Sequence, residues 1–311
     1  MAATKAGETT TGAGALRTRP PELEDWINRV LIHPVSRRVA LALRHTPVTP
    51  NMVSCVSGLS LALAGLAYTL IEWPLAVAAG LFLYLLWHVL DGADGDLARL
   101  TGRSSPTGEL VDGIADYSGH FVLYMAFGAY LGAYLGVWGW LMSAAAAFSR
   151  IAQASHIESV RRTYLWRAYG VPWLGRRKPG EHASSGAARV SGGIASFYLA
   201  LASVLTPRTT RADALIDQRE RNPAAATQAR ELSRSIGRGA LAWQHWLGPN
   251  RRTFLLAASM AAGSPVWFLI FEATLLNLVL FASAVRQRAV NAQLASALEL
   301  APIMADAAHK D

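Results

Sequence analysis

Several apolar runs, most of them long enough to cross a bilayer as a helix, constrain this chain more than any other feature. They cover about residues 52–71, 75–90, 108–135, 137–156 and 253–285. A hydrocarbon core of about 30 Å requires roughly 20 apolar residues of helix, and a backbone inside it must satisfy its own hydrogen bonds. The sequence therefore predicts an all-α, polytopic membrane protein.

The composition agrees with a membrane protein. Hydrophobic residues make up 52% of the chain and charged residues only 16%, whereas soluble domains normally carry more charge. The formal net charge is +8, with the arginines concentrated in loops. This pattern indicates that the arginine-rich loops are cytoplasmic and that they contact anionic membrane lipids. No nucleic-acid motif is found. Cys55 is the only cysteine, which excludes an intrachain disulfide.

The N-terminal part lies outside the apolar runs. Residues 1–20 are rich in Ala, Thr and Gly, and we expect them to be disordered. Residues 21–45 carry apolar side chains at helical spacing with arginines between them, which predicts an amphipathic juxtamembrane helix. A helix packed on the soluble part of the protein is the alternative. The breaker at 46–51 precedes the first span, with Asn51 as the expected N-cap.

The second half of the chain allows two counts of the spans. In one, residues 192–206 cross the membrane and 253–285 form one long helix. In the other, 192–206 lie at the surface, and Gly263-Ser264-Pro265 breaks 253–285 into a helical hairpin. The positive-inside rule favours the hairpin, because it keeps all the arginine-rich segments in the cytoplasm. A single helix over 253–285 would also be roughly 50 Å long, too long for the bilayer core.

The hairpin gives six transmembrane helices with both ends of the chain inside. The predicted regions are the first four spans with the active site in 46–157, a basic cytoplasmic insertion in 158–249, the last two spans in 250–287 and a cytoplasmic tail in 288–311. Glycines at 128, 132 and 136 recur every fourth residue in the third span. Such spacing permits close helix packing, within the chain or across a dimer, and we favour the chain itself.

Acidic residues concentrate where the second apolar run ends and the third begins. Asp91 and Asp94 are three residues apart, and Asp112 and Asp116 are four apart, so each pair lies on one helix face. Helices joined by the short loop 100–107 would turn these faces toward each other. Gathered carboxylates repel, and a hard divalent cation relieves the repulsion. We therefore predict a Mg²⁺ or Mn²⁺ site built from these four aspartates.

Small and basic residues accompany the aspartates. Gly95 and Ala98 leave one helix face bare, so that a ligand can approach the backbone. Arg99 adds a permanent cation suited to phosphate. Carboxylates for metal, space for a ligand and a cation for phosphate together indicate metal-assisted phosphoryl transfer.

The same residues form the pattern D-x-x-D-G-x-x-A-R, eight residues, then G-x-x-x-D-x-x-x-D. It resembles the signature of the CDP-alcohol phosphatidyltransferase family. Every fixed position matches: Asp91, Asp94, Gly95, Ala98, Arg99, Gly108, Asp112 and Asp116. The resemblance implies an integral membrane phosphotransferase of phospholipid biosynthesis. Such an enzyme moves a substituted phosphate from a CDP-linked alcohol to the hydroxyl of an alcohol or lipid acceptor, and releases CMP.

The resemblance also implies roles for individual residues. Asp116 would be the base that activates the acceptor hydroxyl, and would lie near or bridge the metal ions. Gly95, Ala98 and Arg99 would lie beside the CDP group, with Gly108 also among the substrate-binding residues. A six-helix core and a homodimer are implied as well. Because the loop carries arginines and cytidine nucleotides are cytoplasmic, we expect the site to face the cytoplasm, in a bacterial inner membrane.

Three polar positions within the spans remain open. His120 is one turn past Asp116 on the same face, and is a candidate proton relay or acceptor contact, or a packing residue. Arg150 is a candidate for binding an acceptor or lipid phosphate, or for pairing with a carboxylate. Glu272 and Asn277 raise the same question in the last span.

The substrates are not fixed by the sequence. One branch of the family uses CDP-diacylglycerol with a small alcohol, and the other uses CDP-choline or CDP-ethanolamine with a lipid alcohol. Residues 105–112, SPTGELVD, resemble the second branch, but Gly113 stands where those enzymes usually have His. Tyr117 stands where many enzymes with phosphorylated acceptors have Arg or Lys, which argues against a phosphorylated acceptor. An inactive member acting as a membrane scaffold, or a metal transporter, is the alternative from another functional class.

Overall fold

The computed structural model describes residues 20–171 and 210–301. All regular elements in these ranges are helices, which confirms the predicted all-α class. The principal helices are α1 (His33–Leu43), α2 (Pro50–Leu70), α3 (Leu75–Thr101), α4 (Pro106–Leu135), α5 (Val137–Tyr169), α7 (Arg211–Arg219), α8 (Pro223–Gly237), α9 (Gln244–Leu247), α10 (Pro249–Ala261), α11 (Val266–Ala273) and α12 (Leu275–Leu300). The disputed segment 192–206 lies outside the described residues, as do residues 1–19 of the N-terminal segment expected to be disordered and the last ten residues of the predicted tail, 302–311.

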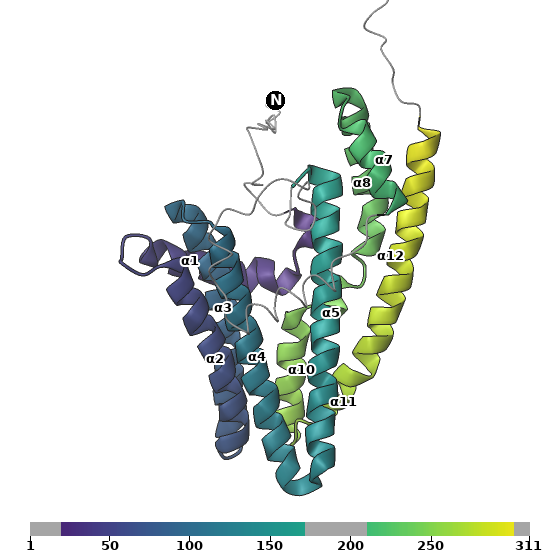
Figure 1. Cartoon of the computed structure of the whole chain (residues 1–311). Coiled ribbons are helices and arrows are strands. Elements are labelled where there is room, and N and C mark those ends of the chain that lie inside the picture. The colour runs from purple at the N-terminus through teal and green to yellow at the C-terminus, as the bar shows by residue number, and fades with distance from the viewer. Residues whose placement is uncertain (1–19, 172–209, 302–311) are drawn as a thin grey trace, which may run out of the picture.

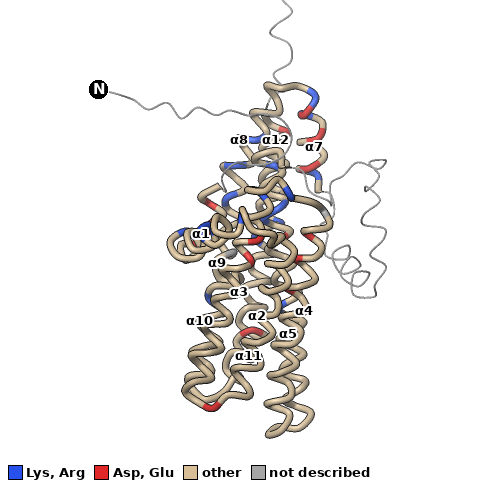
Figure 2. Tube along the Cα trace, turned by 90° about the vertical axis from the view of Figure 1, so that its left-hand side faces the viewer, with Lys and Arg blue, Asp and Glu red and all other residues tan. Residues whose placement is uncertain are grey.

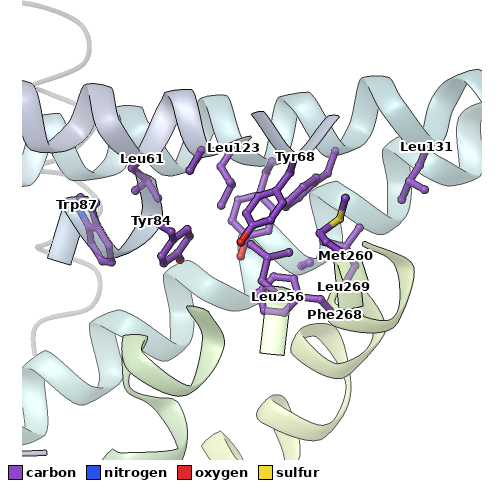
Figure 3. Close-up of a cluster of buried hydrophobic side chains, with 14 residues drawn as sticks. Leu61, Tyr68, Tyr84, Trp87, Leu123, Leu131, Leu256, Met260, Phe268 and Leu269 are labelled. Atoms are coloured by element: carbon purple, nitrogen blue, oxygen red, sulfur yellow. The ribbon is translucent and has the colours of Figure 1, made fainter. Parts of the chain in front are cut away.

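Helices α2, α3, α4 and α5 run up and down beside one another, with α10 and α11 next to them (Figure 1). Their shared core contains aromatic and aliphatic side chains, among them Leu61, Tyr68, Tyr84 and Trp87 (Figure 3). Helices α2 and α4 approach most closely where glycines face the partner backbone. A Cβ added to Gly58 would lie 2.4 Å from the carbonyl oxygen of Ala115, so only glycine permits this contact.

The glycines of the third span pack within the chain. The ring of Trp140 from α5 covers Gly128 and Gly132, which leave the space that a Cβ would otherwise fill. Gly139 lies against the backbone of α4 at Leu131 and Gly132. Gly136 has a different role, because it adopts a left-handed φ of 59° in the turn between α4 and α5. The preference for intrachain packing is confirmed for Gly128 and Gly132.

Charged side chains are concentrated in the upper half of the structure, and the lower half is nearly free of them (Figure 2). By length and composition, three stretches among the described residues are apolar enough to cross a membrane: Pro50–Leu70, Leu75–Thr101 and Val266–Leu300. They correspond to the predicted first, second and last spans. Helices α4 and α5 carry several polar and charged residues and α10 has only 13, so these three do not meet the same criterion.

The chain reverses between α10 and α11. Gly263 has a φ of 91°, and α11 starts directly after Pro265. Ser259 Oγ accepts a hydrogen bond from the Phe268 amide at 3.0 Å, which joins the two helices across the turn. A second irregularity lies at Thr274, whose hydroxyl donates to the Ile270 carbonyl at 2.6 Å where α11 passes into α12. Such a back-bond commonly bends a helix.

Helices α5 and α12 continue upward beyond the apolar bundle and meet α7 and α8 there (Figure 1). Trp166, Ile216, Leu294 and neighbouring side chains form a separate small core between them. Within it, Arg167 Nε lies 2.8 Å from Asp213 Oδ1, and both side chains are buried. We call this group, α7 and α8 with the upper ends of α5 and α12, the polar extension.

The region before α2 is less regular than the single helix predicted for residues 21–45. It contains a short helical turn at Pro21–Leu23, a turn of π-helix at Asn28–Ile32 and then α1. Glu22 accepts hydrogen bonds from Tyr164 and Tyr169 of α5, each at 2.7 Å. Partial burial acts the other way, but these hydrogen bonds hold the pKa of Glu22 below its usual value.

The N-cap predicted for the first span was wrong by two residues. Thr49 caps α2, its Oγ1 accepting a hydrogen bond from the Met52 amide at 3.3 Å. Pro50 occupies the first helical position, where its missing N–H costs nothing. Asn51 is therefore already inside the helix.

A buried polar network ties α10 and α11 to α4 and α5. Arg252 forms an ion pair with Glu272, and both side chains are almost completely buried. Tyr124 donates to the other carboxylate oxygen of Glu272, and Gln153 Oε1 accepts from Arg252 at 2.6 Å. Gln153 also donates to Asn277 at 2.7 Å. Since every charge in the network has partners, it stabilises the helix arrangement.

Glu272→Ala is expected to destabilise the protein strongly, because it leaves Arg252 as an unpaired buried cation. Breaking such a pair costs about 3–5 kcal/mol. Thermal unfolding in detergent measures the effect. Glu299→Ala is the matched control, since Glu299 pairs with Arg211 at 2.5 Å on the surface, where the two side chains are 38% and 77% exposed. Equal losses in both variants would contradict the assigned importance of the network.

Candidate active site

The four aspartates of the motif lie on α3 and α4, on either side of a tight connection. Gly102 ends α3 with a left-handed φ of 66°, and Ser105 caps α4 by accepting a hydrogen bond from the Gly108 amide at 3.0 Å. The connection therefore consists of only a few residues, and the helices leave it side by side. This geometry places the carboxyl groups of Asp94 and Asp112 close enough to act on each other across the interface between α3 and α4.

Asp94 is the most deeply buried aspartate of the motif and is held from α2. Its side chain is 6% exposed, and its Oδ2 accepts a hydrogen bond from Ser54 Oγ at 2.5 Å. Asp91, Asp112 and Asp116 are half-buried. Asp112 also acts electrostatically on Asp116, one turn further along α4. At least three carboxylates thus interact within one region of the bundle.

Asp116 has a neutral hydrogen-bond partner from α3. Trp87 Nε1 donates to Asp116 Oδ1 at 2.6 Å. On its other side, the backbone carbonyl of Asp116 lies 2.9 Å from His120 Nδ1. A carbonyl can only accept, so His120 Nδ1 carries the proton of this hydrogen bond.

His120 and Arg150, which lie 30 residues apart in the sequence, are neighbours in the structure. The Arg150 guanidinium lies 3.2 Å from His120 Nε2, which must accept because arginine can only donate. Both ring nitrogens of His120 are therefore occupied. Arg150 is 9% exposed and acts electrostatically on Asp116, but within the described residues it forms no ion pair with a carboxylate.

The glycines of the motif have only polar or charged side chains as near neighbours. A Cβ added to Gly95 would meet only the guanidinium of Arg99, 3.5 Å away. Arg99 is exposed and pairs with Asp96 Oδ1 at 2.5 Å. Ala98 is half-buried on the same helix, and Gly108 lies near the side chains of Ser105 and Asn51. The Arg99 guanidinium thus lies over Gly95, and a role of this face in binding a ligand remains a prediction.

Glu272 and Asn277, considered as further candidates, belong to the buried network with Arg252. In contrast, three contributors to the site were not predicted from the sequence: Ser54, Trp87 and Asp96. Trp87 is four residues before Asp91 and so shares its helix face, a signal that the sequence contains. Ser54 is on another helix, and only the packing of α2 on α3 brings it to Asp94.

The donor set fits a hard divalent cation. The contact between Asp94 and Asp112 presents carboxylate oxygens from two helices, and neither thiolate nor imidazole competes in that pair. Within residues 20–171 and 210–301, no three His, Cys, Asp or Glu side chains converge closely enough to form a complete metal site. Binding of a metal ion by Asp91, Asp94, Asp112 and Asp116 therefore remains a prediction.

Comparison with known proteins agrees with this geometry. Residues 47–205, about half of the chain, match the profile of the CDP-alcohol phosphatidyltransferase family. The chain belongs to the CDP-alcohol phosphatidyltransferase family. The match includes α2 to α5 and therefore all four aspartates. Family membership, together with the apolar helices, indicates an integral membrane transferase of phospholipid biosynthesis.

A relative from Thermococcus kodakarensis, the bifunctional IPC transferase and DIPP synthase, is 37% identical to this phosphatidyltransferase over 106 residues. The aligned segment covers 33% of this chain and 23% of the relative. The chain thus corresponds to less than a quarter of the relative's length.

Asp94→Asn is expected to weaken Mn²⁺ binding by at least about tenfold, because it removes a carboxylate from the Asp94–Asp112 contact. Titration of Mn²⁺ by electron paramagnetic resonance measures the free ion without any need for turnover. Glu231→Gln is the control, since Glu231 is an exposed carboxylate on α8, away from the four aspartates. Unchanged affinity in Asp94→Asn would exclude this aspartate from the metal ligands.

Proposed function

We propose that this phosphatidyltransferase moves a substituted phosphate from a CDP-linked alcohol to an acceptor hydroxyl, with CMP as the leaving group. The contact between Asp94 and Asp112 in the family motif carries the proposal. Mg²⁺ or Mn²⁺ would be held by Asp91, Asp94 and Asp112, with Asp116 nearby or bridging. When bound, the metal neutralises the diphosphate and stabilises the departing CMP.

The protein's own groups would perform the remaining steps. Asp116 accepts the proton of the acceptor hydroxyl, whose oxygen forms the new bond to phosphorus as the bond from phosphorus to CMP breaks. The bare face at Gly95 and Ala98 admits the CDP group, with Arg99 and Gly108 beside it. Both ring nitrogens of His120 are hydrogen-bonded. We therefore assign His120 the role of holding Arg150 in place, rather than a role in proton transfer.

Arg150 favours one branch of the family. A buried guanidinium with unused N–H donors is costly unless an anion meets it. An acceptor with an anionic group would supply that partner beside Asp116, which suits CDP-diacylglycerol as the donor and a small phosphorylated alcohol as the acceptor. Transfer from CDP-choline or CDP-ethanolamine to a lipid alcohol is the second candidate, supported by the sequence of residues 105–112.

We further propose six transmembrane helices, formed by α2, α3, α4, α5, α10 and the joined pair α11–α12. Helices α4, α5 and α10 pack side by side with the apolar helices and extend into the same charge-poor half (Figures 1 and 2). The basic loops favour a cytoplasmic site. A homodimer in a bacterial inner membrane is the assembly that we expect.

Release of CMP by the purified protein with Mg²⁺ or Mn²⁺ tests the proposed reaction. One arm supplies CDP-diacylglycerol with small alcohols, both phosphorylated and neutral. The other supplies CDP-ethanolamine or CDP-choline with diacylglycerol. Release confined to one arm identifies the branch. Release in neither arm, from protein that binds metal and CDP, would favour the alternative of an inactive membrane scaffold.

Asp116→Asn is expected to lower turnover at least about a hundredfold, because the amide keeps the shape of the carboxylate but takes no proton. Asp112→Asn should do the same through the metal. Size-exclusion profiles in detergent establish that both variants fold. Turnover near that of the unmodified protein in Asp116→Asn would exclude Asp116 as the base.

Arg150→Gln is expected to raise KM for a phosphorylated acceptor about tenfold or more, through loss of a charge-assisted hydrogen bond. The KM of the CDP-linked donor should change little. Steady-state titration of each substrate separates the two effects. If KM rises for neutral and phosphorylated acceptors alike, Arg150 supports the site without binding an anion.

A further inference from the structure

Trp87 lies outside the family motif, yet its side chain reaches the motif. It is on α3, one turn before Asp91, and is 3% exposed. Its Nε1 donates to Asp116 Oδ1 across the interface between α3 and α4, at 2.6 Å. This hydrogen bond links the helix carrying the first two aspartates to the last aspartate of the second pair.

The ring of Trp87 is fixed on several sides. It lies 4.4 Å from the ring of His88 and 5.4 Å from that of Tyr84, measured between centroids. The ring of His120 meets it edge-on, at 5.3 Å and 89°. Its backbone carbonyl also accepts a hydrogen bond from Ser57 Oγ of α2, at 3.2 Å. In Figure 3 the Trp87 ring stands beside Tyr84 and Leu61 in the core. A donor held this firmly can orient its acceptor.

The chemistry of the indole determines what this contact does. An indole N–H can only donate, so Asp116 Oδ1 must present a lone pair to it. Oδ2 is left as the oxygen of this carboxylate that the indole does not engage. The contact also prevents the carboxylate from rotating freely, at a reaction step where displacement by about 1 Å can cost a hundredfold in rate.

We propose that Trp87 is a positioning residue that fixes the Asp116 carboxylate through its indole N–H, and so makes Oδ2 the oxygen that receives the acceptor's proton. The inference rests on the proposed function, because it assumes that Asp116 acts as the base. It adds a residue that no fixed position of the motif specifies. Ser54 holds Asp94 from α2 in a similar way, which suggests that neutral donors outside the motif position both aspartates.

The test compares Trp87→Phe with the unmodified protein, in the substrate arm that releases CMP. Phenylalanine keeps an aromatic ring but removes the N–H. We expect kcat to fall about ten- to a hundredfold, with KM for the CDP-linked donor and the Mn²⁺ dissociation constant unchanged within about twofold. Trp140→Phe is the matched control, since Trp140 packs on Gly128 and Gly132, far from the aspartates, and should leave kcat unchanged.

A second replacement separates positioning from packing. Benzothienylalanine, incorporated at position 87, has nearly the shape of tryptophan with sulfur in place of N–H. Loss of kcat in this variant, at an unchanged unfolding midpoint, supports the proposal even if Trp87→Phe folds poorly. Unchanged kcat, or a parallel loss of kcat, donor affinity, metal affinity and stability, would overturn it. Absence of turnover in the unmodified protein would instead count against the proposed function.

Discussion

The close approach of α2, α3 and α4 is the constraint on which the site depends. Gly58 lets α2 lie against the backbone of α4 at Ala115, and a Cβ there would come within 2.4 Å of a carbonyl oxygen. This contact lies directly beside Asp116, the residue that follows Ala115 on α4. Since Ser54 is on the same helix as Gly58, the packing that brings the helices together also supplies a hydrogen-bond donor to Asp94.

Polar groups inside the bundle form two sets with different chemistry. The network of Arg252, Glu272 and Gln153 joins its members to one another, and an internally satisfied network stabilises a structure without needing a ligand. The set around Asp116 and Arg150 differs, because its cation and carboxylates do not pair directly. A buried cation close to carboxylates that it does not pair with is typical of sites that bind substrate.

Much of this organisation could be predicted from the sequence. The apolar runs and the spacing of the aspartates act locally, through helix periodicity, so the all-α class and the meeting of α3 and α4 follow from them. The breaker at Gly263–Pro265 likewise marks the turn between α10 and α11. Thr49 was missed as the N-cap, because threonine and asparagine both occur in the breaker and only the backbone conformation decides between them.

The remainder depended on contacts between distant residues. Helix periodicity placed His120 on the same face as Asp116. It could not predict that Arg150 would donate to the Nε2 atom of His120. Ser54 and Trp87 are ordinary residues of apolar helices until packing brings them to carboxylates. The partners of Glu272 were equally hidden, because they come from α4, α5 and α10. A single sequence contains no direct record of such pairs.

Two helices, α5 with 33 residues and α12 with 26, pass without interruption from the apolar bundle into the polar extension. Each of these helices joins the two parts as one continuous element. Arg150 and Gln153 sit on the first of these rods, and α7 and α8 are fastened to both. The extension and the interior of the bundle are therefore joined through the same helix that carries Arg150 to the site.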